Sequence, residues 1–293
     1  MSEPLVTATW LATALDDPCL CLCLLDASVE LATPQFDGDY RAESGYTGWM
    51  AGHIRGARHA DLSSVLADPD ASFNFALPDA QLALDALQKL GVSDDSRVVL
   101  YDRSDGFWAA RLWWMLRSLG IDSAVLDGGL RAWIAAGFSL EQGESAEIPR
   151  GTLSSPAKYR DGFWIDRQGV EQVVAGEADG TLVCALSTAL FDGSAVTRYA
   201  RRGHIPGSSN LPARSLFDDG GFYRRGAALN EALSGLRQAE PPLLLYCGGG
   251  ISAAALALAL TLGGETRVAI YDGSLQEWAA EPSLPLTTGA APD

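Results

Sequence analysis

The sequence predicts an α/β fold of two similar tandem domains, each a mostly parallel β-sheet flanked by helices. Three observations predict it. Short sequence blocks recur once in the same order, short apolar runs alternate with segments of helical length, and the apolar runs are continuous instead of alternating with polar residues. Continuous apolar strands separated by helices are typical of parallel sheets that are buried on both faces.

The repeat is carried by three pairs of blocks. They are GHIRGA at 52–57 and GHIPGS at 203–208, VVLYD at 98–102 and LLLYC at 243–247, and DGGLRAW at 127–133 and DGSLQEW at 272–278. The first pair lies 151 residues apart and the other two lie 145 residues apart. Because the order and nearly the spacing are kept, we interpret the chain as two copies of one fold.

Each copy contains the elements of such a fold in order. Short apolar runs bounded by turn or charged residues predict strands, and longer segments with helical spacing predict helices. In the first copy we expect strands at 20–25, 97–101 and 123–126, and helices at 79–90 and 106–119. In the second copy we expect strands at 181–186, 243–246 and 267–271, and helices at 166–175, 252–262 and 274–280. In parallel sheets the chemistry lies at the carboxyl ends of the strands, so those ends are where a site is expected.

A linker is predicted between the copies. Residues 142–161 contain Gly, Pro, Ser and charged residues without apolar periodicity. We therefore predict one domain at 1–145 and a second at 146–293. The first has a net charge of −12 and the second of −4, so charge favours the second as the one that handles an anion.

The composition argues against several classes of protein. The chain has 293 residues, and 37 acidic against 21 basic side chains give a formal net charge of −16. Nucleic acid and anionic membranes attract basic surfaces, so we expect neither as a partner. The longest apolar candidate, 253–262, is shorter than the roughly 18 residues of a membrane span. Residues 1–10 lack the pattern of an export signal, so we expect a cytoplasmic protein with reduced thiols.

The most informative segment follows the apolar run 243–246. Cys247 comes directly after this run, then Gly248, Gly249 and Gly250, and then an Ala- and Leu-rich helical segment. Glycines let backbone amides crowd around one point, and amides at a helix N-terminus bind anions. The same geometry stabilises a thiolate, which makes Cys247 a candidate nucleophile. Its amide cradle would come from residues 248–253, and the candidates are Gly248, Gly249, Gly250, Ile251, Ser252 and Ala253.

Two alternatives stay open for this segment. Cys247 could be a buried cysteine at the end of a strand, with the glycines forming a tight turn. Ser252 could hydrogen-bond the sulfur or cap the helix. The repeat favours the reactive interpretation, because the first copy has Asp102 at the equivalent position and lacks the three glycines. One copy would then be catalytic and the other inactive.

These motifs resemble the tandem-domain rhodanese sulfurtransferases. The resemblance covers nearly the whole chain and rests on the paired Gly-His-Ile blocks, the loop at 247–253 and the paired Asp-Gly-x-Leu-x-x-Trp blocks. It implies two rhodanese-like domains and a cysteine in the second that takes a sulfane sulfur from a donor, becomes a persulfide, and passes the sulfur to cyanide or a thiol. It implies neither a metal nor an organic cofactor. The segment 101–115 is most similar to the mercaptopyruvate sulfurtransferase branch.

The chain departs from that branch at five positions. Two arginines that hold the donor carboxylate are replaced by Leu186 and Leu190, and the third loop position has Gly249 where the branch has Ser or Thr. The Asp and His that partner this position align with Ser63 and Phe75. The leucines suggest an apolar mouth, which would admit a larger or neutral donor such as an organic persulfide.

Other cations would then be needed for an anionic donor. Arg198, Arg201 and Arg202 are the nearest in sequence, and Arg198 matches an arginine often found in the family. A surface charge or a structural ion pair is the alternative for each. A rival function is a persulfide carrier for a protein acceptor, with little turnover of small molecules, and the lost arginines favour it. A weaker rival is a redox-sensing thiol module in which Cys184 and Cys247 form a disulfide.

The remaining cysteines and histidines are expected to be structural. Cys19, Cys21 and Cys23 alternate with leucines, which predicts three thiols on one face of a core strand. His53 and His204 occur in both copies, including the one without a nucleophile, so we expect them to stabilise the fold.

Overall fold

The chain folds into two compact units. The computed structural model describes residues 3–290. Unit 1 runs to Glu30 and continues with Ala42–Asp70 and Leu77–Arg160, whereas unit 2 comprises Leu31–Arg41, Ala71–Ala76 and the chain from Asp161 onward. The domain boundary at 145/146 remains a prediction from the sequence. The division by contacts lies at 160/161 and assigns two segments of the first half of the sequence to unit 2.

Unit 1 is built on a five-stranded parallel sheet with the order β1-β7-β6-β2-β5. Its strands are β1 (Leu5–Val6), β2 (Leu22–Asp26), β5 (Arg58–His59), β6 (Arg97–Tyr101) and β7 (Ser123–Leu126). Its helices are α1 (Ala8–Leu15), α2 (Tyr46–Ala51), α3 (Ala80–Lys89), α4 (Phe107–Ser118) and α5 (Gly129–Ala135). A separate two-stranded ladder joins β3 (Val29–Leu31) and β4 (Ala42–Ser44).

Unit 2 repeats the same topology with the order β8-β12-β11-β9-β10, again all parallel. Its strands are β8 (Trp164–Ile165), β9 (Thr181–Cys184), β10 (Ser209–Asn210), β11 (Leu243–Tyr246) and β12 (Val268–Tyr271). Its helices are α6 (Arg167–Val174), α7 (Thr188–Phe191), α8 (Gly226–Ala232), α9 (Ile251–Leu262) and α10 (Ser274–Trp278), with 3-10 turns η1 (Ala213–Leu216) and η2 (Ser234–Leu236). The predicted fold class is confirmed.

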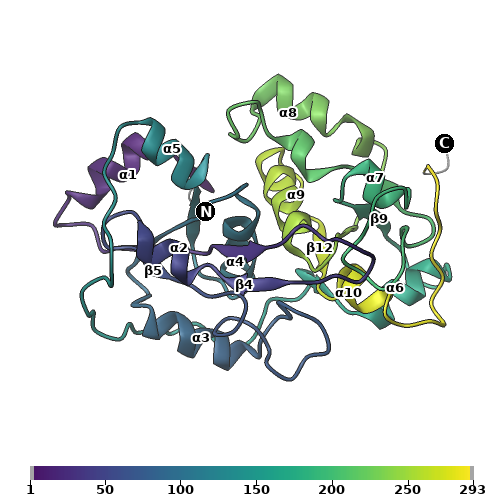
Figure 1. Cartoon of the computed structure of the whole chain (residues 1–293), viewed down its shortest axis with the longest axis horizontal. Helices are drawn as coiled ribbons and strands as arrows, with labels where there is room; N and C mark the ends of the chain where they lie inside the picture. The colour runs from purple at the N-terminus through teal and green to yellow at the C-terminus, as the bar shows by residue number, and fades with distance from the viewer. Residues whose placement is uncertain (1–2, 291–293) are drawn as a thin grey trace. The chain divides into compact units, whose positions relative to one another are not determined.

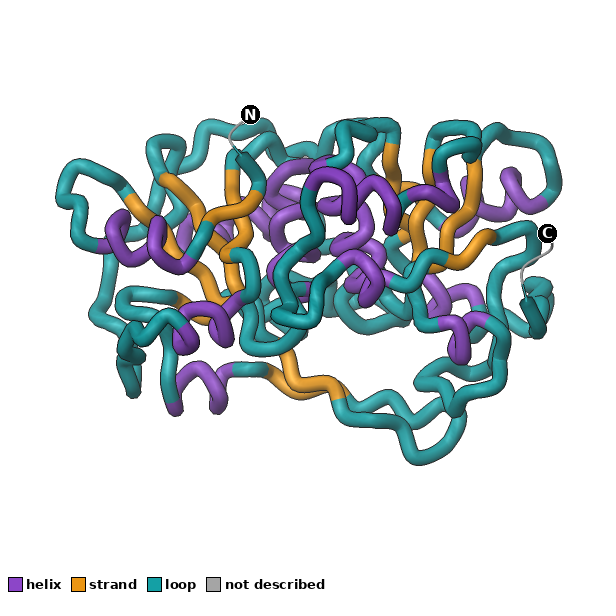
Figure 2. Tube along the Cα trace, turned by 90° about the horizontal axis from the view of Figure 1, so that it is seen from above, coloured by secondary structure: helices purple, strands orange, loops and turns teal. Residues whose placement is uncertain are grey.

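Helices cover both faces of each sheet because the interior residues of the central strands are apolar, such as Val98–Leu100 of β6 and Leu243–Leu245 of β11. In unit 2, α9 lies on one side of β12 while α6 and α10 lie on the other (Figure 1). Figure 2 shows the strands running side by side with helices around them. The face toward α6 and α10 is closed by a core that includes Val170, Leu244 and Leu275, all at most 3% exposed. No helix within residues 3–290 combines the length and apolar character needed to cross a lipid bilayer.

The prediction for the three N-terminal cysteines was wrong in part. Strand β2 begins at Leu22, so only Cys23 lies in it and is buried, whereas Cys19 and Cys21 are exposed. The cause is a turn initiated by Asp17, whose carboxylate accepts the Cys19 amide at 2.9 Å. The alternation of Cys and Leu therefore continues through a turn before pairing with β6 begins.

The two repeated histidines stabilise the turns that carry them. His53 and His204 are each 1% exposed. The Nδ1 atom of His53 lies 2.9 Å from the Trp49 carbonyl oxygen, and that of His204 lies 2.9 Å from the Phe191 carbonyl oxygen. Each ring also stacks on the aromatic ring of that same neighbour. This pairing in both copies agrees with the expected structural role.

Candidate active site

Cys247 lies where β11 ends and the loop to α9 begins. Its side chain is 2% exposed. Gly250 closes the loop with a φ of +75°, a left-handed conformation that glycine adopts without strain, and α9 starts at the next residue. The alternative that Ser252 caps this helix is wrong, because Gly250 is the N-cap residue and Ser252 is already the second helical residue. The left-handed turn at Gly250 brings the helix to within four residues of the cysteine.

Most backbone amides around Cys247 are free to bind one acceptor. Within residues 3–290, no protein acceptor receives a hydrogen bond from the amides of Gly248, Gly249, Ile251, Ser252 or Ala253. Gly250 departs from the expected cradle, because its amide donates to Ser274 Oγ at 3.1 Å. An amide cluster without acceptors at a helix N-terminus favours an anion at its centre.

Ser274 fixes the base of this loop. Its Oγ accepts hydrogen bonds from the backbone amides of Cys247 and Gly250, both at 3.1 Å. The same hydroxyl donates a hydrogen bond to the Tyr271 carbonyl at 2.7 Å. Ser274 is fully buried and has a φ of +48°, in the left-handed region that side chains other than glycine rarely adopt. The equivalent residue of the first copy is Gly129, with a φ of +57°. The second copy therefore accepts backbone strain at a position that orients the loop.

The equivalent loop of the first copy shows what this backbone geometry binds. Asp102 Oδ1 accepts the amides of Ser104 at 2.9 Å and Gly106 at 3.0 Å, and Oδ2 accepts that of Ala109 at 3.0 Å. These amides favour the carboxylate, although burial outweighs them and raises the pKa of Asp102. A side chain at this position thus collects the amides of the following turn, and Cys247 occupies the same position in the second copy.

Segments from the first half of the sequence contribute to the surroundings of Cys247 within unit 2. The Gln276 Nε2 atom donates to the Tyr40 hydroxyl at 3.2 Å, and its Oε1 accepts from the Asn74 backbone amide at 3.0 Å. Burial is the main cause that raises the pKa of Tyr40, and the charge of Cys247 is the next. Because Gln276 lies against Gly249, its bond to Tyr40 ties this phenol to the loop that follows Cys247.

The three candidate arginines have different environments. Arg201 donates to four backbone carbonyls, and Arg202 donates to Asp37 at 2.7 Å and to a carbonyl. Arg198 donates through Nε and Nη2 to the Ala32 carbonyl, while its Nη1 has no hydrogen-bond partner within residues 3–290. The positive charge of Arg198 lowers the pKa of the Tyr40 phenol, against the effect of burial. Of these three side chains, Arg198 is the one whose charge acts on both Tyr40 and Tyr199.

Apolar groups stand where the similar branch has polar ones. Leu186 packs against the unit 2 core, and Phe75 is 4% exposed, 6.4 Å from Tyr40 between ring centroids. Phe75 also has a φ of +64°, which is strained for a bulky side chain. Leu186 therefore contributes to the core of unit 2, and the apolar mouth stays a prediction.

Cys184 is a buried core residue at the end of β9. It is fully buried, and burial raises the pKa of its thiol to about 12. A thiol with this pKa is protonated at neutral pH and is a poor partner for disulfide formation. The environment of Cys184 therefore disfavours the redox-sensing alternative.

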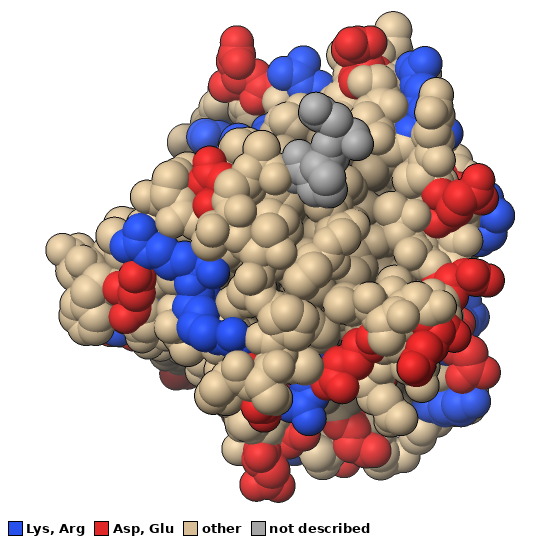
Figure 3. Space-filling view, turned by 90° about the vertical axis from the view of Figure 1, so that its right-hand side faces the viewer, with Lys and Arg blue, Asp and Glu red and all other residues tan. Residues whose placement is uncertain are grey.

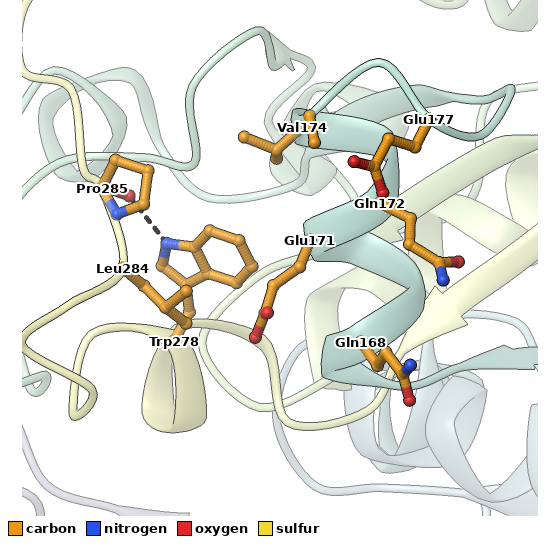
Figure 4. Close-up of a pocket in the computed structure, with 9 residues that line it drawn as sticks. Gln168, Glu171, Gln172, Val174, Glu177, Trp278, Leu284 and Pro285 are labelled. Atoms are coloured by element: carbon orange, nitrogen blue, oxygen red, sulfur yellow. Dashed lines mark hydrogen bonds between the residues drawn. The ribbon is translucent and has the colours of Figure 1, made fainter.

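Unit 2 has a surface pocket whose lining contains no residue of the Cys247 loop. A surface pocket of about 420 Å³ is formed between α6 and the C-terminal segment, with the Trp278 indole donating to the Pro285 carbonyl at 2.8 Å (Figure 4). Its lining contains Glu171, Glu177 and glutamines but no cysteine or histidine.

On the face drawn in Figure 3, the described basic side chains form separate groups with acidic ones between them. Within residues 3–290, no three His, Cys, Asp or Glu side chains are grouped as metal ligands.

Comparison with known proteins identifies the class of molecule to which this fold and site belong. The model of the rhodanese-like domain matches residues 7–136 and 176–281. The chain belongs to the rhodanese family of sulfurtransferases, as its motifs predicted.

Individual relatives match over nearly the whole chain. The 3-mercaptopyruvate sulfurtransferase of Escherichia coli K12 is 30% identical, covering 96% of this chain and 96% of that protein. The mitochondrial thiosulfate/3-mercaptopyruvate sulfurtransferase 1 of Arabidopsis thaliana is 32% identical, covering 97% and 78%. The crystal structure of SseA from E. coli, described as a 3-mercaptopyruvate sulfotransferase with the rhodanese fold, has a TM-score of 0.77 at 28% identity, covering 93% of this chain and 99% of SseA.

Sequence reasoning missed four residues that lie around Cys247. Tyr40 and Tyr199 carry no motif, and Gln276 occupies a variable position of the Asp-Gly-x-Leu-x-x-Trp block. Ser274 could have been found, because it replaces Gly129 within an otherwise matched block. A residue that differs between two copies, of which one has the nucleophile, is a signal available from one sequence.

Proposed function

We propose that this protein transfers a sulfane sulfur from a donor to a thiophilic acceptor through a persulfide on Cys247. The observation that carries the proposal is the loop from Cys247 to the N-terminus of α9, in which the amides of Gly248, Gly249, Ile251, Ser252 and Ala253 have no acceptor within residues 3–290. The first copy supports it, because Asp102 collects three amides at the equivalent position. Stabilising an anion is what both a thiolate and a terminal persulfide sulfur require.

The reaction has two half-steps. The Cys247 thiolate attacks the sulfane sulfur of the donor, an S–S bond forms, and the bond from that sulfur to the rest of the donor breaks. The electron pair leaves with the donor remnant, for example as sulfite from thiosulfate. An acceptor thiolate or cyanide then attacks the outer sulfur, and Cys247 leaves as the thiolate that began the cycle. Amides of Gly248, Gly249, Ile251, Ser252 and Ala253 would hold the charge in both states.

The donor is a small molecule with a transferable sulfur. The names of the relatives point to mercaptopyruvate and thiosulfate, and the apolar surroundings keep an organic persulfide as a third candidate. The open Nη1 donor of Arg198 would bind the anionic part of the donor. Acceptors would be cyanide or a thiol, including a thiol of a protein.

The test is steady-state turnover with mercaptopyruvate, thiosulfate and glutathione persulfide separately, with cyanide as the acceptor. We expect turnover with at least one donor and a loss of about a thousandfold or more in Cys247→Ser. Cys19→Ser, at an exposed cysteine, is the matched control and should keep wild-type turnover. A clear preference for mercaptopyruvate would refute the apolar-mouth interpretation, and unchanged turnover in Cys247→Ser would refute the proposal.

A persulfide carrier for a protein partner is the second candidate. It is favoured by Leu186 and Leu190, which remove two anion contacts of the similar branch. A carrier would become persulfidated once at Cys247 yet turn over poorly with cyanide. Stoichiometric sulfur uptake without catalytic turnover would therefore favour the carrier, whereas repeated turnover favours the enzyme.

A further inference from the structure

The glycine directly after the nucleophile is complementary to a tyrosine from another segment. A Cβ atom built on Gly248 would overlap the hydroxyl oxygen of Tyr199 and would lie 2.8 Å from its Cε1 atom. The Tyr199 side chain thus occupies the space that a side chain at position 248 would fill. Glycine is required at 248 because this phenol lies against the loop.

The first copy fills the same space from the opposite side. Gly48 lies 151 residues before Tyr199, the offset of the Gly-His-Ile blocks, and Arg103 lies 145 residues before Gly248, the offset of the strand block. A Cβ atom built on Gly48 would lie 3.1 Å from Arg103 Nε. In the first copy, therefore, the loop carries the side chain and the neighbouring segment is glycine, whereas in the second copy the two roles are exchanged. The exchange delivers a phenol to the loop that contains the cysteine.

The Tyr199 hydroxyl is an unused hydrogen-bond donor beside Cys247. The residue is 8% exposed, and its hydroxyl has no hydrogen-bond partner within residues 3–290. Burial is the main cause that raises the pKa of this phenol, and the charge of Cys247 is the next, so it stays protonated next to the cysteine. A hydroxyl beside the loop that donates to no protein group is available to donate to a bound ligand atom.

A second polar side chain is held over the next loop residue. A Cβ atom built on Gly249 would overlap the Nε2 atom of Gln276. The Gln276 carboxamide is fixed by Asn74, whose backbone amide and Nδ2 donate to its Oε1 at 3.0 Å and 3.1 Å, while its Nε2 donates to the Tyr40 hydroxyl and the Asn74 carbonyl. Gln276 therefore forms a fixed polar wall where the similar branch has a Ser or Thr side chain on the loop itself.

We propose that Tyr199 is a catalytic residue whose hydroxyl donates a hydrogen bond to the outer sulfur bound at Cys247, with Gln276 forming the adjacent wall. This inference rests on the proposed function and names a residue for it. The proton of the phenol is shared in a hydrogen bond and is not transferred, so the electron balance of sulfur transfer is unchanged. A neutral phenol and a carboxamide at these positions suit a singly charged outer sulfur on Cys247. They also suit a donor whose remaining part is small or uncharged.

The experiment compares wild type, Tyr199→Phe and the exposed control Tyr46→Phe, with two readouts. We expect Tyr199→Phe to lower kcat/KM for persulfide formation about a hundredfold, as for loss of one donor to a developing anion. It should also lower the fraction of Cys247 present as persulfide at equilibrium with thiosulfate and sulfite, while leaving the melting temperature near that of wild type. A merely structural tyrosine would not change this equilibrium.

A second set of variants uses the complementarity at the next loop position. Gly249→Ser should impair uptake because its Cβ overlaps Gln276, and Gly249→Ser with Gln276→Ala should recover part of it. Wild-type rates and persulfide fraction in Tyr199→Phe would overturn the inference while leaving the proposed function intact. Failure of the wild-type protein to form any Cys247 persulfide would overturn both.

Discussion

The two copies place the same loop in the same fold and use it for opposite purposes. In unit 1, Asp102 is 1% exposed, and its carboxylate accepts hydrogen bonds from three backbone amides of the segment that follows it. The donors of this loop are therefore satisfied within the loop. In unit 2, Cys247 leaves the surrounding amides without acceptors, and Ser274 anchors the loop from below. A loop that satisfies its donors internally contributes to stability, whereas a loop with open donors binds a ligand. The difference teaches that one backbone turn can be closed by its own side chain or left open, and that the open copy adds Ser274 beneath the loop and glycines within it.

The largest effect that would break this comparison is expected at Asp102. Asp102→Ala removes a buried acceptor from three amides, so we expect the free energy of unfolding to fall by about 3 kcal/mol or more. Asp102→Asn keeps one acceptor oxygen and should lose less. Chemical denaturation measures both, with the exposed Asp95→Ala as a control. If Asp102→Ala unfolded like wild type, the first loop would not be held by this carboxylate.

An intermediate effect is expected at Ser274. Ser274→Gly loses three hydrogen bonds, worth about 1 kcal/mol each, and relieves left-handed strain of about 1 kcal/mol. We therefore expect a net loss of about 2 kcal/mol in stability, together with about a tenfold to hundredfold slower sulfur uptake because the loop is no longer oriented. Single-turnover kinetics and a denaturation curve measure the two.

The reverse substitution sharpens the same point. Gly129→Ser should destabilise unit 1, because a Cβ there lies 2.6 Å from the Asp102 carbonyl oxygen and the φ is left-handed. Sulfur uptake per folded molecule should stay unchanged. Equal effects of Ser274→Gly and Gly129→Ser on uptake would contradict the assignment of different roles to the two loops.

The sequence predicts the central strands and Cys247, but not the side chains that approach the loop from other segments. Continuous apolar runs and the ordered repeat predicted the three central strands of each sheet, whereas the two-residue edge strands β1, β5, β8 and β10 are too short to give such a pattern. Cys247 stood out because the repeat offered Asp102 for contrast. Tyr40, Tyr199 and Asn74 could not be predicted, because they reach the cysteine from segments that have no motif and whose position depends on tertiary contacts. The turn at Asp17 makes this strand begin at Leu22, later than predicted, for a local reason, an Asx hydrogen bond that competes with strand pairing.

A smaller effect concerns the two cysteines of unit 2. Because the pKa of Cys184 is raised to about 12, it should resist alkylation at about pH 8 in the folded protein, while exposed Cys19 reacts. Cys184→Ala should leave sulfur uptake within about twofold of wild type, at a small loss of packing. Peptide mapping after iodoacetamide treatment provides the measurement. A Cys184–Cys247 disulfide after mild oxidation would restore the redox-sensing alternative.

The smallest effect is expected from acid. The Arg202 guanidinium and the Thr197 amide lower the pKa of Asp37, which ties Leu31–Arg41 to the rest of unit 2. A depressed folded-state pKa gives stability that is present above the unfolded value of about 3.9 and is lost as the pH falls through the folded value. The melting temperature should therefore fall in this window, and fall less in Asp37→Asn. An identical acid profile of the two proteins would show that this ion pair does not hold the segment.

The most direct test of the whole account is the mass of the Cys247 peptide after exposure to thiosulfate, mercaptopyruvate and polysulfide separately. We predict that at least one donor adds one sulfur atom, about 32 Da, to Cys247 and that cyanide then removes it. Sulfur found on another cysteine, or no cyanide-labile sulfur with any of the three donors, would contradict the central claim that the open loop of the second copy makes Cys247 the sulfur carrier.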